Sequence, residues 1–284
     1  MITADGFGLK GPRGWVFRDV SFTAPAGALV AVEGPSGSGR TCLLLSLTGR
    51  MRATEGRAEV AGFRLPKQLA AVRRVAALGP VIGVAELDPA LTVGEHLRER
   101  VLLQRRFGDS LRELIRPTGY DETRSASPRG WRRVAGGREA ASRARVDEAL
   151  AAAGLDLSAL PKAERTAARD LERIEALRLG TALALLARPK VLAVDDADHK
   201  LGPAERDQAW EMLRGIAASG TTVLAVCSEA PADAVVVRTR GPAGTHAGTP
   251  RHGGEADADA AVGSDDENTD EEGAADAHAE AGRA

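Results

Sequence analysis

Residues 34–41 combine glycines, hydroxyl groups and one cation in a spacing that suits phosphate binding. The segment reads Gly-Pro-Ser-Gly-Ser-Gly-Arg-Thr and lies between an apolar run and a helical pattern. Its glycines allow the backbone to turn N–H groups toward a polyphosphate, and the start of a helix adds a favourable dipole. Such loops offer the hydroxyl of their last residue, here Thr41, to a magnesium ion. The segment therefore predicts a site for the phosphates of a nucleotide.

Arg40 occupies the position where a phosphate-binding loop of this kind normally carries a lysine. The positive charge is kept, but a guanidinium is a planar fork whereas an ammonium is compact. We expect phosphate binding to persist and the geometry of phosphate transfer to suffer. The candidate nucleotide ligands are Gly34, Pro35, Ser36, Gly37, Ser38, Gly39, Arg40, Thr41 and Cys42.

Asp195 and Asp196 directly follow Val191–Val194, an apolar run that is typical of a buried strand. A glycine-rich loop alone occurs by chance fairly often. A loop followed about 150 residues later by an apolar strand and two aspartates is a more specific combination. The alternative interpretation is an acidic pair on the surface at the end of a strand.

The remaining pattern predicts strands that alternate with helices around the loop. Strands are expected at 15–22, 28–32, 58–61, 75–78, 191–194, 221–227 and 235–238. Helices are expected at 93–107, opened by a capping box of Thr92 and Glu95, and at 141–153, 163–187 and 203–219. The prolines and glycines of residues 108–140 predict a loose insertion, and from 241 the chain has almost nothing to bury. We predict a domain at 1–240 and a disordered acidic tail at 241–284.

The net charge of −2 conceals two opposed blocks. Residues 255–284 carry 11 acidic side chains and one basic one, whereas residues 1–254 carry a net charge of +8. No apolar run approaches the ~20 residues that span a bilayer, and the N-terminus lacks the pattern of a secretion signal. The two cysteines, Cys42 and Cys227, are expected to be reduced residues of the core.

Taken together, these motifs resemble the ATP-binding subunit of an ATP-binding cassette (ABC) transporter over residues 2–240. The resemblance implies an α/β fold of the P-loop NTPase class, with an antiparallel β subdomain and a helical subdomain at about 90–175. The motifs follow the family's order and spacing. They are Val16–Ser21, Gly34–Thr41, Leu91–Leu97, Val191–Asp196 and Ala230–Val237.

The resemblance implies that the chain binds ATP and Mg²⁺. Thr41 and Asp195 would hold the metal, and Asp196 would orient the attacking water. The family uses a glutamate at that last position, so Asp196 is shorter by one methylene, about 1.5 Å of reach. Trp15 is a candidate to stack on the adenine, although packing within the domain explains it equally well.

Three other motifs of the family are degenerate in this chain. Counting back from Asp195 places the signature loop, Leu-Ser-Gly-Gly-Gln in the family, at Leu171–Glu175, where two carboxylates would face phosphate. The switch histidine maps onto Ser228, and the glutamine of the Q-loop maps near Pro80. Neither side chain can replace the family's residue. As a plain helix, Leu171–Glu175 needs no functional explanation.

Residues 98–146 contain 13 arginines against six acidic residues, together with Tyr120 and Trp131. Arginines interleaved with aromatic residues can bind nucleic acid, but two aromatics are few and no nucleic-acid-binding motif accompanies them. In ABC subunits the helical subdomain faces the membrane. Anionic lipid heads would favour this charge by ~1 kcal/mol per residue close to the surface. We expect a membrane surface here rather than a nucleic-acid partner.

The sequence predicts an ATP-binding subunit that couples ATP binding and hydrolysis to a separate membrane permease. Its expected location is the cytoplasmic face of the cell membrane, where it would be peripheral. The expected partners are the permease and a second ATP-binding subunit, either identical or different. Hydrolysis would be slow or dependent on that partner. The alternative is a regulatory subunit that binds nucleotide with little or no ATPase activity of its own.

Overall fold

The computed structural model describes residues 1–107 and 128–240, and the side chains within 1–104 and 139–240. All of these residues belong to one compact unit, Met1–Gly244. The predicted acidic tail at 241–284 and residues 108–127 of the predicted insertion lie outside the described residues.

A four-stranded antiparallel sheet is built from the first part of the chain, with strand order β2-β1-β4-β5. Its strands are β1 (Ile2–Gly11), β2 (Gly14–Ala24), β4 (Glu55–Val60) and β5 (Phe63–Leu65). Ile2, Phe7 and Phe17 are at most 1% exposed, so one face of this sheet belongs to the core. The predicted antiparallel subdomain is confirmed.

A five-stranded parallel sheet carries the sequence motifs, in the order β6-β7-β8-β3-β9. Its strands are β3 (Leu29–Glu33), β6 (Ala76–Leu78), β7 (Val191–Val194), β8 (Thr222–Cys227) and β9 (Val235–Arg238). Every residue of β7 and β8 is buried, which requires cover on both faces and explains their continuous apolar runs.

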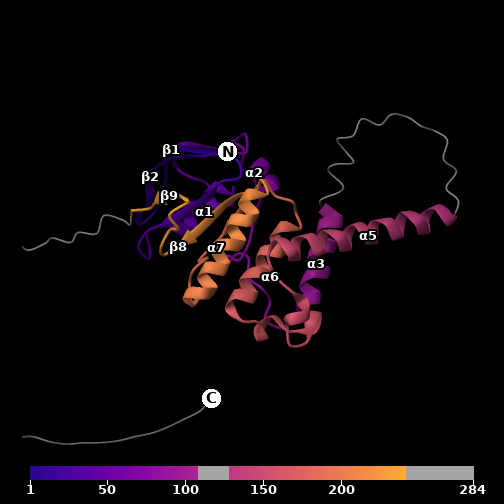
Figure 1. Ribbon diagram of the computed structural model, residues 1–284. Helices are drawn as coiled ribbons and strands as arrows, with labels where there is room; N and C mark the ends of the chain where they lie inside the picture. The colour runs from indigo at the N-terminus through magenta and orange to yellow at the C-terminus, as the bar shows by residue number, and fades with distance from the viewer. Residues whose placement is uncertain (108–127, 241–284) are drawn as a thin grey trace, which may run out of the picture. The chain divides into compact units, whose positions relative to one another are not determined.

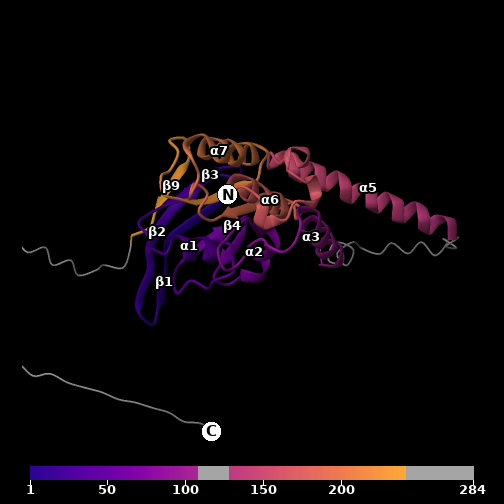
Figure 2. The same cartoon turned by 90° about the horizontal axis from the view of Figure 1, so that it is seen from below.

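The helices fall into two groups (Figures 1 and 2). The helices α1 (Arg40–Leu47) and α2 (Leu69–Val75) each contact one strand of each sheet, and α7 (Pro203–Ala218) contacts β3 and β8 of the parallel sheet. The helices α3 (Val93–Phe107) and α5 (Pro128–Ala152) each contact α6 (Arg173–Leu185), and their buried side chains join one apolar cluster. No helix within the described residues is long and apolar enough to cross a membrane.

Two predicted helix starts are wrong. The helix predicted at 163–187 begins at Arg173, because residues 166–168 pair with the segment at 91–93 instead and Ala163 has a left-handed φ of 49°. The helix predicted at 141–153 begins at Pro128, so residues 128–140 are helical rather than loose. Proline is favoured at the first position of a helix, and arginine and alanine are strong helix formers.

The parallel sheet sets the position of every motif that follows one of its strands. The phosphate-loop segment follows β3, Asp195 and Asp196 follow β7, and Ser228 follows β8. Because the strands are parallel, these segments emerge at the same carboxyl edge, where open α/β sheets bind ligands.

Candidate nucleotide-binding site

The loop between β3 and α1 has the backbone that its glycines predict. Gly37 and Gly39 have φ of 78° and 82°, a left-handed conformation that side chains with a Cβ rarely adopt. A Cβ on Gly39 would also collide with the carbonyl oxygen of Val16 in β2, whereas one on Gly37 would meet open space. Gly39 is the N-cap of α1, so the loop leads directly into a helix N-terminus.

The loop rests on the end of β9. The hydroxyls of Ser38 and Thr239 lie 2.6 Å apart, and the two residues are 0% and 3% exposed. A Cβ on Gly34 would lie 2.5 Å from the hydroxyl of Thr239 and 2.6 Å from that of Ser38. Gly34 is therefore needed here for the close approach of another chain segment.

Arg40 connects the loop to the end of β8. Its Nη1 donates to the carbonyl oxygen of Cys227 at 2.6 Å, next to Ser228. A guanidinium carries five N–H donors, so one bond to a carbonyl leaves donors for a phosphate. The guanidinium of Arg40 can therefore bind the Cys227 carbonyl, next to Ser228, and a phosphate at the same time. The ammonium of a lysine is a single point charge and lacks this forked geometry.

Thr41 and Asp195 are in direct contact. The Thr41 hydroxyl donates to Asp195 Oδ2 at 2.8 Å, although 154 positions separate the two residues. Asp195 is only 4% exposed, and its backbone N–H donates to the carbonyl of Pro80 after β6. Burial raises the pKa of this carboxyl above its ordinary value, against the opposing hydrogen bond from Thr41.

Asp196 adopts a left-handed backbone conformation with φ of 48°. Its N–H donates to Asp195 Oδ1 at 3.2 Å, and its own side chain is partly exposed at the sheet edge. Aspartate and asparagine tolerate this backbone better than most residues. The conformation is therefore a structural reason for an aspartate at this position, independent of any catalytic role.

Asp198 holds the segment after β8. This carboxylate is 5% exposed and accepts backbone N–H bonds from Ser228, at 2.9 and 3.0 Å, and from Glu229 at 3.2 Å. Asp198 was not predicted from the sequence. The one available signal was its position three residues after Asp195. A turn of the chain after β7 brings Asp198 beside the end of β8.

The segment Leu171–Glu175 lies at the start of α6. Glu172 is the N-cap, and its N–H donates to Glu175 Oε2 at 2.8 Å. A glutamate three residues into a helix commonly makes this bond, so the plain helical interpretation accounts for both carboxylates. The segment contains no glycine with which a backbone could approach a phosphate closely.

The donor set at this sheet edge fits magnesium with a nucleotide better than a metal held by protein alone. Among the described residues, no group of three or more His, Cys, Asp or Glu side chains could hold a metal ion. Mg²⁺ is commonly bound through one or two oxygen side chains together with substrate phosphates. Thr41 and Asp195 supply such oxygens beside the phosphate loop.

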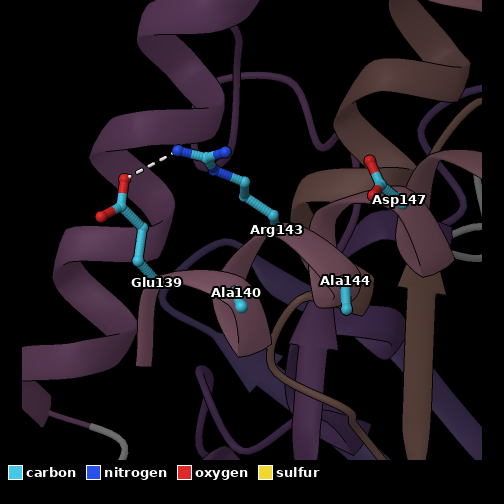
Figure 3. A pocket seen from close by; sticks show the side chains of 5 residues that line it. All are labelled: Glu139, Ala140, Arg143, Ala144 and Asp147. Atoms are coloured by element: carbon cyan, nitrogen blue, oxygen red, sulfur yellow. Dashed lines mark hydrogen bonds and ion pairs between the residues drawn. The ribbon is translucent and has the colours of Figure 1, made fainter. Parts of the chain in front are cut away.

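A shallow hollow on α5 is a separate feature (Figure 3). It is lined by Glu139, Ala140, Arg143, Ala144 and Asp147, and Arg143 pairs with Glu139 at 3.0 Å. Both charged side chains are more than half exposed, and this i, i+4 pair is typical of a solvated helix face. The hollow presents no nucleophile or buried base.

A family model for the ABC transporter family matches residues 17–199, which is more than half of the chain. The chain belongs to the ABC transporter family. The matched residues include the loop, the Thr41–Asp195 contact and Leu171–Glu175.

Two of the relatives are named as ATP-binding proteins. The chain is 27% identical over 209 residues to the Nod factor export ATP-binding protein I of Rhizobium johnstonii, covering 74% of the chain and 55% of that protein. It is 31% identical over 207 residues to the cobalt import ATP-binding protein CbiO of Rhodobacter capsulatus, covering 72% and 61%. The chain thus spans little more than half the length of these relatives.

Solved structures show the same fold. The dimeric, ADP- and Pi-bound ATP-binding cassette MJ0796 matches with a TM-score of 0.57 at 19% identity, over 81% of this chain and 88% of that one. CbiO1 of Clostridium perfringens matches with a TM-score of 0.55 at 16% identity, over 80% and 78%. The predicted ABC-type cassette fold is confirmed.

Proposed function

We propose that this chain is the ATP-binding subunit of an ABC transporter and binds Mg-ATP at the carboxyl edge of its parallel sheet. The observation that carries the proposal is the Thr41–Asp195 contact beside a loop with left-handed Gly37 and Gly39. Residues 34–42 would surround the phosphates, with backbone N–H groups and the guanidinium of Arg40 as donors. Related ATP-binding subunits and the ADP-bound cassette structure support this assignment.

Thr41 and Asp195 would hold the magnesium ion, which neutralises charge on the phosphate oxygens when it is bound. A divalent cation would also offset the cost of keeping the Asp195 carboxylate charged while it is 4% exposed. Asp196 would orient the water that attacks the γ-phosphate. Because its side chain is shorter than glutamate and positional errors near 1 Å can cost on the order of a hundredfold in rate, we propose that hydrolysis is slow.

The dimer partner would supply the glycine-containing signature loop that is missing at Leu171–Glu175. In the family the signature loop of one subunit clasps the nucleotide of the other, and the MJ0796 cassette is dimeric. Here Glu172 and Glu175 would bring negative charge toward phosphate. A second ATP-binding subunit with a glycine-containing signature would remove this repulsion at the site formed by residues 34–42. We therefore favour a heterodimer as the hydrolysing form.

A permease in the membrane would be the transport partner, because the described helices contain no membrane span and named relatives act in export or import. The chain would then lie peripherally on the cytoplasmic face of the membrane. The alternative function is that of a nucleotide-binding regulatory subunit. It is favoured by one specific observation, the pair of carboxylates at the start of α6.

The test measures Mg-ATP binding by calorimetry and phosphate release by the full chain and by an Asp196→Asn variant. Asparagine tolerates the left-handed backbone, so the substitution reports on the carboxylate rather than on strain. Binding with hydrolysis that disappears in the variant supports the ATPase. Binding without hydrolysis in either protein shows that this chain alone is not an ATPase, as the regulatory function and the heterodimer both require, and the same assay with the second ATP-binding subunit added then separates the two. Absence of binding contradicts both functions.

A further inference from the structure

We infer that Thr239 is a positioning residue for the phosphate-binding loop, holding it in the shape that accepts a nucleotide. The inference rests on the proposed nucleotide-binding function. Thr239 lies 201 positions after Ser38 in the chain and outside the stretch that matches the family model, residues 17–199. No motif of the sequence analysis includes it.

Thr239 contacts the loop at two points. Its hydroxyl lies 2.6 Å from the Ser38 hydroxyl, so the two groups share a hydrogen bond in which either can donate. Its hydroxyl and carbonyl oxygens also occupy the space beside Gly34, where a Cβ would lie 2.5 and 2.7 Å from them. Thr239 thus touches the first glycine of the loop and the residue before its last glycine.

Thr239 is itself fixed to the sheet. Its N–H donates to the carbonyl of Glu33, the last residue of β3, at 2.9 Å. The preceding residue, Arg238, pairs with the Glu33 carboxylate at 3.1 Å. The loop is therefore braced between the strand from which it emerges and the end of β9, its neighbour in the sheet.

Because the two hydroxyls are buried, losing the hydrogen bond between them would cost free energy. Ser38 and Thr239 are 0% and 3% exposed, so water cannot readily replace a lost partner. An unpaired buried hydroxyl costs free energy and favours a rearranged backbone in which it finds another partner. At Ser38 that rearrangement would turn neighbouring N–H groups of the loop away from the phosphates, because these groups belong to the same tight turn.

The experiment compares Thr239→Val with Thr239→Ser, Ser38→Ala and a matched control, Thr222→Val, in the full chain. Thr222 is also a buried threonine, 1% exposed, whose hydroxyl accepts the Gly27 N–H at 3.1 Å. It is the first residue of β8, at the end of the strand away from Cys227 and the candidate site. T239V removes the bond to Ser38 and a longer bond, at 3.4 Å, from the Thr239 hydroxyl to the Glu33 carbonyl, whereas T222V removes one bond. Neither substitution changes the side-chain volume much. Mg-ATP affinity is measured by calorimetry and thermal stability by circular dichroism.

We expect T239V to weaken ATP binding about tenfold, equivalent to about 1.4 kcal/mol. T239S, which keeps the hydroxyl, should bind like the wild type, and T222V should lose comparable thermal stability without losing affinity. In the S38A/T239V double variant the affinity should fall no further than in either single variant, because both remove the same bond.

Equal ATP affinity of T239V and wild type would overturn the inference while leaving the proposed function intact. Equal losses of affinity in T239V and T222V would overturn it as well, since they would reflect general destabilisation. If T239V does not fold, S38A decides: wild-type affinity in S38A overturns the inference. A wild-type chain that binds no ATP overturns the proposed function, and the inference falls with it.

Discussion

The Thr41 hydroxyl donates to Asp195 Oδ2 at 2.8 Å, which joins the start of α1 to the end of β7. The contact closes the phosphate loop against the strand that carries the carboxylates. It requires β3 and β7 to lie in one parallel sheet with β8 between them. The site is therefore a product of strand order and not of either motif alone.

Thr41→Val should weaken Mg-ATP binding about tenfold or more, because it removes both the contact with Asp195 and one oxygen that would face the metal. Thr41→Ser keeps the hydroxyl and should restore the affinity. Calorimetry with and without Mg²⁺ measures the effect. An unchanged response to Mg²⁺ in the valine variant would contradict the metal role of Thr41.

Gly39→Ala should abolish ATP binding, whereas Gly37→Ala should reduce it less. Both positions have a left-handed backbone, which costs an alanine about 1–2 kcal/mol. Only at Gly39 does the new Cβ also collide with the carbonyl of Val16. Titration of both variants with a fluorescent ATP analogue measures the difference. Equal effects would show that the approach of β2 to the loop is unimportant.

Arg40→Ala should weaken ATP binding ten- to a hundredfold, the order expected for losing charge-assisted hydrogen bonds. Arg40→Lys keeps the charge and should retain binding. Arg57→Ala is the control, because it removes one positive charge whose ion pair with Asp5 is largely exposed. Filter binding of radiolabelled ATP compares the four proteins. Wild-type affinity in R40A would mean that the guanidinium serves only the Cys227 carbonyl.

Cys227 should resist alkylation in the folded protein. Burial raises the pKa of its thiol to about 12, with nearby Asp198 and Glu33 adding to the effect. Only the thiolate reacts, so at pH 8 about one molecule in 10⁴ is reactive, against roughly a quarter for a free cysteine. Reactivity should rise with pH toward 12. Iodoacetamide labelling at pH 8, read by mass spectrometry before and after denaturation, measures this protection.

Contiguous sequence signals predicted the centre of the site and much of the parallel sheet. The phosphate loop, Asp195 and the buried strands β7 and β8 all follow from local composition, because burial on both faces demands uninterrupted apolar runs. Strand β1 was not predicted. Its glycines obscure the alternation, and its pairing with β2 has several register shifts.

The contacts that complete the site depend on tertiary structure and carry no local signal. Thr239 reaches Ser38 only because β9 is placed beside β3. The bond from Arg40 to the Cys227 carbonyl depends in the same way on β8 lying next to β3. The left-handed φ of Asp196 could not be predicted from the sequence either. This backbone conformation is nevertheless one reason for an aspartate at the position.

The most direct test of nucleotide binding is calorimetric titration of the full chain with ATP and with AMP, each in the presence of Mg²⁺. In the proposed site the loop, Arg40 and the Thr41–Asp195 pair would bind the β- and γ-phosphates, which AMP lacks. We predict saturable binding of ATP and at least a hundredfold weaker binding of AMP, about 2.7 kcal/mol. No binding of ATP, or equal binding of the two nucleotides, would contradict the assignment of residues 34–42 as a phosphate site.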